Sequence, residues 1–174
     1  MSKHGTSAAV QGWYMEFVGA LRETLSAKEK PAGNAYPVAV DYGKSVEEMV
    51  KSGRYDRANR DIASEHFPTK RTRKTESEVE LVHLKRRVST DEALEELDRM
   101  GCRPAELREL LAFGEKYPDV QREFPVVALG SVWQDPGGYR NIPYLYRDGS
   151  NRDLLLYWVG DDWSELCRFA AVRK

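Results

Sequence analysis

Apolar and polar residues follow two different periods from residue 78 onward, and together these periods predict one α+β domain. Residues 78–84 alternate as a half-buried strand, with Val79, Leu81 and His83 on one face. Four later stretches are alternating or continuously apolar and also predict strands: 126–133, 139–146, 153–159 and 168–173. Two helical stretches lie between the first strand and these four. The predicted order is strand, helix, helix and then a sheet of four antiparallel strands.

The first of the two helices has clear signals at both ends. Residues 89–92 read Ser-Thr-Asp-Glu, a capping box, and Val88 and Ala93 can form the flanking hydrophobic contact. Ala93, Leu94, Leu97 and Met100 then form one apolar stripe. Gly101 is a suitable stop, because glycine readily takes the left-handed conformation that ends many helices.

The second helix is expected to begin at Pro104, a residue favoured at the first helical position, and to end before Pro118. The charged residues of both helices are expected to face solvent: Glu95, Glu96, Asp98, Arg99, Glu106, Arg108 and Glu109.

Turn residues connect the later strands. Residues 135–138 read Asp-Pro-Gly-Gly and predict a turn that joins residues 126–133 and 139–146 as a hairpin. Pro143 lacks a backbone donor, which places the second strand of that hairpin at an edge or at a bulge.

The residues before position 75 are interrupted more often by glycine and proline. Three short helices are predicted here: 12–27, 45–51 with a capping box at Ser45, and 55–64. Residues 70–74 contain four basic side chains; they could contact phosphate, but a solvated linker is the favoured interpretation. The expected organisation is an N-terminal extension or small helical subdomain over residues 1–75 and a ligand-binding domain over 76–174.

Composition narrows the functional classes. Lys and Arg number 27 against 28 Asp and Glu, a net charge of −1, which does not favour general adhesion to nucleic acid or membranes. No apolar run approaches the roughly 20 residues that span a bilayer. No signal peptide is recognised at the N-terminus, so a cytoplasmic location is expected. Cys102 and Cys167 lack metal-ligand spacing, and no metal or cofactor is expected.

The segment from Asp153 to Lys174 carries the functional signal. One face of its first strand holds Leu154, Leu156 and Trp158, and the other face is equally apolar. A sheet that is covered on one side needs only one apolar face, so the second face should be covered by the N-terminal extension or exposed as a recognition patch. A loop of acidic, aromatic and small residues, 160–167, follows.

The order of these elements, with a last strand that can return beside the first, resembles the C-type lectin fold. The ending Cys-Arg-Phe-Ala-Ala-Val-Arg at 167–173, and Gly-Ser-Val-Trp at 130–133 upstream, are similar to formylglycine-generating-enzyme-type members of that fold. The run from Arg103 to the C-terminus resembles more closely the variable proteins of diversity-generating retroelements, of the type found in candidate-phylum bacteria and nanoarchaea. In that family a retroelement rewrites adenine-containing codons, and the changed residues lie on the ligand-facing surface.

The resemblance divides the C-terminal segment into two interleaved sets. It implies scaffold roles for Leu154, Leu156, Trp158, Asp162, Trp163, Arg168 and Phe169. It implies diversified, ligand-binding roles for Leu155, Tyr157, Val159, Gly160, Asp161, Ser164, Leu166 and Cys167. The family's template usually favours Asn at such sites, and none of these residues is Asn.

The function implied is non-enzymatic binding of a macromolecular ligand, with a protein as the expected partner. Tyrosines at 139, 144, 146 and 157 suit such a role, because tyrosine offers a large contact area at low entropic cost. An enzyme is the first alternative; the oxidative chemistry of the formylglycine-generating relatives would need two close cysteines that hold copper, and nothing in the sequence brings Cys102 and Cys167 together. Binding of nucleic acid through residues 70–74 is the second alternative.

Overall fold

The computed structural model describes residues 33–174, and the helix expected over residues 12–27 lies outside this range. The described elements are β1 (Ala35–Asp41), α2 (Val46–Gly53), β2 (Arg57–Ala58), β3 (Lys74–Val82), α3 (Thr90–Arg99), β4 (Cys102–Pro104), α4 (Leu107–Lys116), α5 (Val120–Glu123), β5 (Val126–Val127), β6 (Trp133–Gln134), β7 (Arg140–Asp148), β8 (Asn151–Trp158) and β9 (Arg168–Arg173). The described part is thus an α+β protein, as predicted.

One mixed, open sheet contains the strands in the order β1-β3-β9-β5-β7-β8-β2, with β4 also paired to β9 and β6 to β7. The last strand lies antiparallel beside β3, with Ala171 opposite Glu80. The sequence predicted this arrangement, in which the last strand returns beside the first predicted strand. Most pairs are antiparallel, but β5–β9 and β2–β8 are parallel.

The two serine capping boxes form as predicted. Ser45 accepts from Glu48 N at the start of α2, and Ser89 accepts from Glu92 N at the start of α3. These signals are local in sequence, so they do not depend on the tertiary fold. Gly101 takes a φ of +72° after α3, also as predicted. Met100 is an exception on the apolar stripe, since it is 44% exposed.

The second predicted helix begins later than expected. Residues 102–104 pair with β9, and Ala105 N donates to Ala170 O at 2.8 Å, so Pro104 belongs to a strand and α4 starts at Leu107. The solvent-facing assignment of Arg108 and Glu109 is also wrong, because both are buried.

Glu109 is buried because it has a partner. Arg103 donates from Nη2 to Glu109 Oε1 at 2.6 Å and from Nη1 to Oε2 at 2.9 Å. A paired carboxylate of this kind can be taken out of water, whereas an unpaired one cannot.

Three further predictions are corrected. Residues 55–64 do not form a helix, because Asp56 N and Asn59 N donate to carbonyls of β8 and hold the chain against that strand. Residues 126–133 form two short strands, β5 and β6, rather than one. Strand β7 is paired on both sides, so Pro143 is not in an edge strand. The first strand, β1, was not predicted at all.

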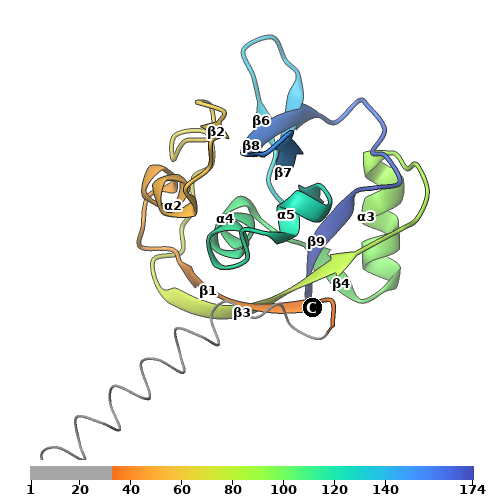
Figure 1. Cartoon of the computed structure of the whole chain (residues 1–174), viewed down its shortest axis with the longest axis horizontal. Helices are drawn as coiled ribbons and strands as arrows, with labels where there is room; N and C mark the ends of the chain where they lie inside the picture. Colours follow the sequence, from red (N-terminus) through yellow and green to blue (C-terminus); the bar gives the residue numbers. More distant parts are fainter. Residues whose placement is uncertain (1–32) are drawn as a thin grey trace, which may run out of the picture. The chain divides into compact units, whose positions relative to one another are not determined.

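The core consists of two clusters that lie on opposite sides of β9. The larger cluster packs around α4 with β1 and β3, and the smaller cluster contains residues of α3. Figure 1 shows α4 and α5 on one side of β9 and α3 on the other. Because β1 pairs with β3 and α2 packs against α4, residues 35–75 belong to the same compact unit as the rest, so the expected boundary near residue 75 does not separate two units.

Within residues 33–174, no helix is both long enough and apolar enough to cross a bilayer.

Candidate ligand-binding surface

The loop that follows β8 is anchored at its centre by Trp163. This side chain is only 2% exposed, and its Nε1 donates to Thr90 Oγ1 at 3.0 Å. Its backbone forms an antiparallel bridge with Val88. The Thr90 hydroxyl in turn donates to Val159 O at 3.2 Å, so the first turn of α3 holds both the start and the middle of the loop.

The register of β7 and β8 determines which side chains share a face. Leu155 is opposite Tyr144, and Tyr157 is opposite Ile142. Paired residues point to the same side of a sheet, so these four share one face. Ile142 is fully buried there, while the other three are half-buried.

Tyr144 contacts two other tyrosines on this face. The ring of Tyr144 lies 5.8 Å from those of Tyr146 and Tyr157, centre to centre. We call Tyr144, Tyr146, Leu155 and Tyr157 the tyrosine patch. Burial raises the pKa of Tyr144 to about 12 and also raises the pKa of Tyr157, so these phenols stay protonated and neutral at physiological pH. A neutral, partly apolar patch with hydroxyl donors is chemistry typical of protein recognition.

The predicted ligand-binding residues differ in exposure. Gly160, Asp161 and Leu166 are exposed, and Leu166 is 64% exposed. Half-buried positions are Leu155, Tyr157, Val159 and Ser164. The structure therefore brings seven of the eight predicted residues to, or partly to, the surface.

Cys167 is the exception, and its ligand-facing assignment is corrected. It is 8% exposed and packs in the smaller core cluster, with Sγ 3.7 Å from Ser164 Oγ. Burial raises the pKa of the Cys167 thiol, which keeps it protonated and unreactive. Cys102 is also a buried free thiol.

The predicted scaffold set needs correction as well. Leu154, Trp163 and Phe169 are buried, and Leu156 and Arg168 are half-buried. Asp162, however, is exposed, and Trp158 is 43% exposed. Trp158 is the last residue of β8, beyond the part of the sheet that the larger core covers. Its ring meets Tyr139 edge-on at 5.8 Å and lies over Gly160, where a Cβ would be 2.3 Å from the indole. A larger residue at position 160 therefore requires the indole to move.

A groove of about 680 Å³ adjoins the exposed end of β8. His66 stacks on Trp133 in its wall, with ring centres 4.5 Å apart and planes at 18°. Leu156, Tyr139 and Asp61 also line it. Sequence reasoning missed this groove, since Trp133 was assigned to the strand predicted over 126–133 and nothing local connects it to residues 59–66.

Among residues 33–174, no group of three or more His, Cys, Asp or Glu side chains is arranged to hold a metal ion. The basic residues 70–74 are exposed, and Arg71 donates to Tyr42 Oη at 2.7 Å. Compared with known protein families, curated proteins and solved structures, the chain matches none.

Proposed function

We propose that this chain is a non-enzymatic binding protein of C-type lectin-like architecture, a variable protein whose C-terminal surface is diversified by a retroelement. The contact residues in this proposal are Leu155, Tyr157, Val159, Gly160, Asp161, Ser164 and Leu166. The expected ligand is a protein.

The observation that carries the proposal is the division of one short segment into fixed and free side chains. Trp163 and Phe169 lie beneath the surface, with ring centres 6.3 Å apart. Asp161, Ser164 and Leu166 alternate with such buried positions yet lie at or near solvent. A loop held by its buried tryptophan can change its neighbouring side chains at little cost in folding free energy, since surface substitutions usually change it by less than about 0.5 kcal/mol.

The strand that precedes the loop supports the same interpretation. The tyrosine patch is contiguous with the loop, because Tyr157 contacts Trp163 with ring centres 4.8 Å apart. Aromatic rings held in place by their neighbours lose little entropy when a ligand binds.

The decisive test of the retroelement part of the proposal is genomic. We expect a near-identical template repeat of the codons for residues 154–169 beside a reverse-transcriptase gene, with differences confined to adenine positions. If the neighbourhood contains neither, or if copies of the gene differ evenly across codons, the proposal of diversification is wrong.

The binding part has its own test. A display library that randomises Leu155, Tyr157, Asp161, Ser164 and Leu166 should yield binders to an unrelated globular protein such as lysozyme. A matched library at five exposed positions outside this surface, for example Lys51, Glu65, Glu76, Glu78 and Glu115, should yield none. Equal yields from the two libraries would contradict the assignment of the surface.

A further inference from the structure

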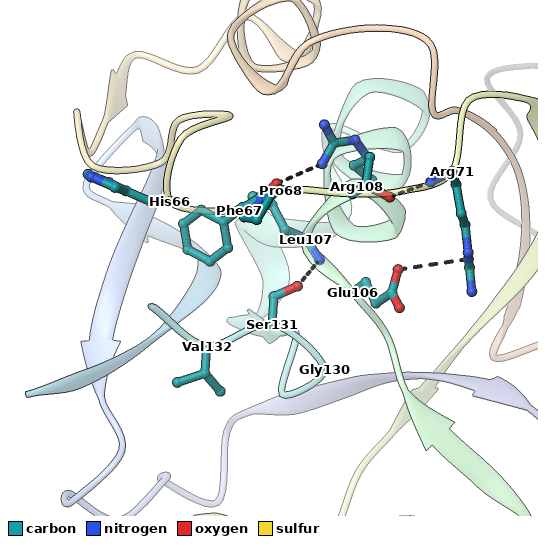
Figure 2. Close-up of a pocket in the computed structure, with 11 residues that line it drawn as sticks. His66, Phe67, Pro68, Arg71, Glu106, Leu107, Arg108, Gly130, Ser131 and Val132 are labelled. Carbon is teal, nitrogen blue, oxygen red and sulfur yellow. Dashed lines mark hydrogen bonds and ion pairs between the residues drawn. The ribbon is translucent and has the colours of Figure 1, made fainter. Parts of the chain in front are cut away.

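A second cavity, of about 270 Å³, lies between residues 66–71 and the N-terminal end of α4. Its lining comes from three segments: residues 66–69 with Arg71, residues 106–108, and residues 130–132. Figure 2 shows most of these residues. It is lined differently from the tyrosine patch, with two arginines among its residues.

Arg108 is an unusual residue in this wall. Its side chain comes from the first turn of α4 and reaches the backbone at Phe67, where Nη1 donates to the carbonyl at 3.0 Å. Arg108 is only 7% exposed, and its Nε has no hydrogen-bond partner. Within residues 33–174, no carboxylate forms an ion pair with it, and burial lowers its pKa.

A buried guanidinium without a counter-ion is costly, because it loses hydration that nothing replaces. The other buried cations of this fold are compensated: Arg152 donates to four carbonyls and to Gln121 Oε1, and the partly buried Arg103 forks onto Glu109. Arg108 has a single carbonyl. Arg108 therefore has N–H groups that could donate to an anion.

Three other features of the wall favour an anion, whereas the carboxylate of Glu106 disfavours one. The N-terminal end of α4, ten residues long, carries the positive end of the helix dipole. Ser131 Oγ accepts from Leu107 N at 2.8 Å, which leaves the hydroxyl proton free to donate into the cavity. Arg71 pairs with Glu106 only loosely, at 3.8 Å, while its Nη1 also donates to Tyr42 Oη at 2.7 Å, so an anion can replace the Glu106 contact with the arginine still held by Tyr42.

We propose that this cavity binds a small anion, a carboxylate or a phosphate group, between Arg108 and Arg71. Such a site is independent of the tyrosine patch, and it does not rest on the proposed function. Through this site the protein would bind a small anionic molecule or the terminal carboxylate of a peptide, in addition to the macromolecular ligand proposed above.

The test is a titration of the full chain with sodium phosphate and, separately, with sodium acetate, against sodium chloride at matched ionic strength. Heteronuclear NMR should show saturable shifts of the Leu107 and Ser131 amides and of the Arg108 Nε–H signal for at least one of the two anions. The anion with the lower dissociation constant shows whether the site prefers a phosphate group or a carboxylate.

Three variants sharpen the test. Arg108→Gln should weaken binding at least about tenfold, since a charge-assisted hydrogen bond is lost. Arg71→Gln, at an exposed side chain, should weaken binding severalfold without affecting folding, and so keeps the test valid if Arg108→Gln does not fold. Arg147→Gln, at an exposed arginine outside the cavity, should leave the affinity unchanged.

Shifts that never saturate with either anion, or that spread over exposed arginines instead of the cavity, would overturn the proposal. The same conclusion would follow if Arg71→Gln and the folded Arg108→Gln variant bound as tightly as the parent chain.

Discussion

The first half of β8 is held by buried polar groups, whereas its second half and the loop beyond it face solvent. Arg152 is 5% exposed and donates to the carbonyls of Gly53, Gly114 and Pro118, at 2.9, 2.9 and 3.0 Å. Asp153, 1% exposed, accepts from Arg57 Nη2 at 2.6 Å. From Leu155 onward the strand carries half-buried and exposed side chains instead.

The difference suggests how one strand can combine stability with a changeable surface. Arg152 donates to backbone carbonyls of residues 53–54, 114 and 118 and to the side chain of Gln121, and these contacts hold the start of β8 in place. Trp163 does the same for the loop. Between these two anchors, Leu155, Tyr157 and Asp161 are half-buried or exposed, so we expect that they can be replaced without loss of the fold.

The largest expected effect is at the buried anchors beneath the loop. Phe169→Ala should lower the free energy of unfolding by about 3–5 kcal/mol, as large-to-small changes in a core do. Trp158→Ala should cost only about 1 kcal/mol, because that side chain is 43% exposed. Chemical denaturation of both variants checks the contrast. Equal losses of unfolding free energy would show that Trp158 is a scaffold residue after all.

Arg152→Met should cost about 3 kcal/mol, because it leaves several buried carbonyls without a donor at once. Arg147→Met, five residues earlier in the same hairpin and exposed, is the control and should be near neutral. If Arg152→Met unfolds at the same denaturant concentration as the control, the polar anchor of β8 is not needed for stability.

Thr90→Val removes the acceptor of Trp163 Nε1 and the donor to Val159 O without changing the size of the side chain. We expect a loss of about 1–2 kcal/mol, since an indole N–H is left buried and unpaired. The matched control is Thr75→Val, at an exposed threonine of β3. Equal melting behaviour of the two variants would mean that the loop is held by packing alone.

Short-range chemistry explains what the sequence could predict. The capping boxes at Ser45 and Ser89 depend only on neighbouring residues, and so do the apolar patterns that predicted strands at β3 and β9. The alternation in β8 likewise gave the division into two faces. It could not show that the outer end of the strand extends past the core, which is why Trp158 was misplaced.

Most of the features that the sequence could not predict depend on contacts between residues far apart in the chain. Arg57 reaches Asp153 over 96 residues, and this pairing replaces the helix expected over 55–64. Arg108 and Glu109 look like ordinary helix-surface charges until residues 66–71 and Arg103 are placed against them. Nothing local in the sequence distinguishes such a charge from a solvated one.

The most direct test of the central claim is to replace Leu155, Tyr157, Ser164 and Leu166 together with asparagine and to measure the free energy of unfolding. The account predicts one cooperative transition and a loss below about 2 kcal/mol, since each of these residues is exposed or half-buried. A variant that is unfolded, or that loses as much stability as Phe169→Ala, would show that these side chains belong to the core and would contradict the assignment of a changeable binding surface.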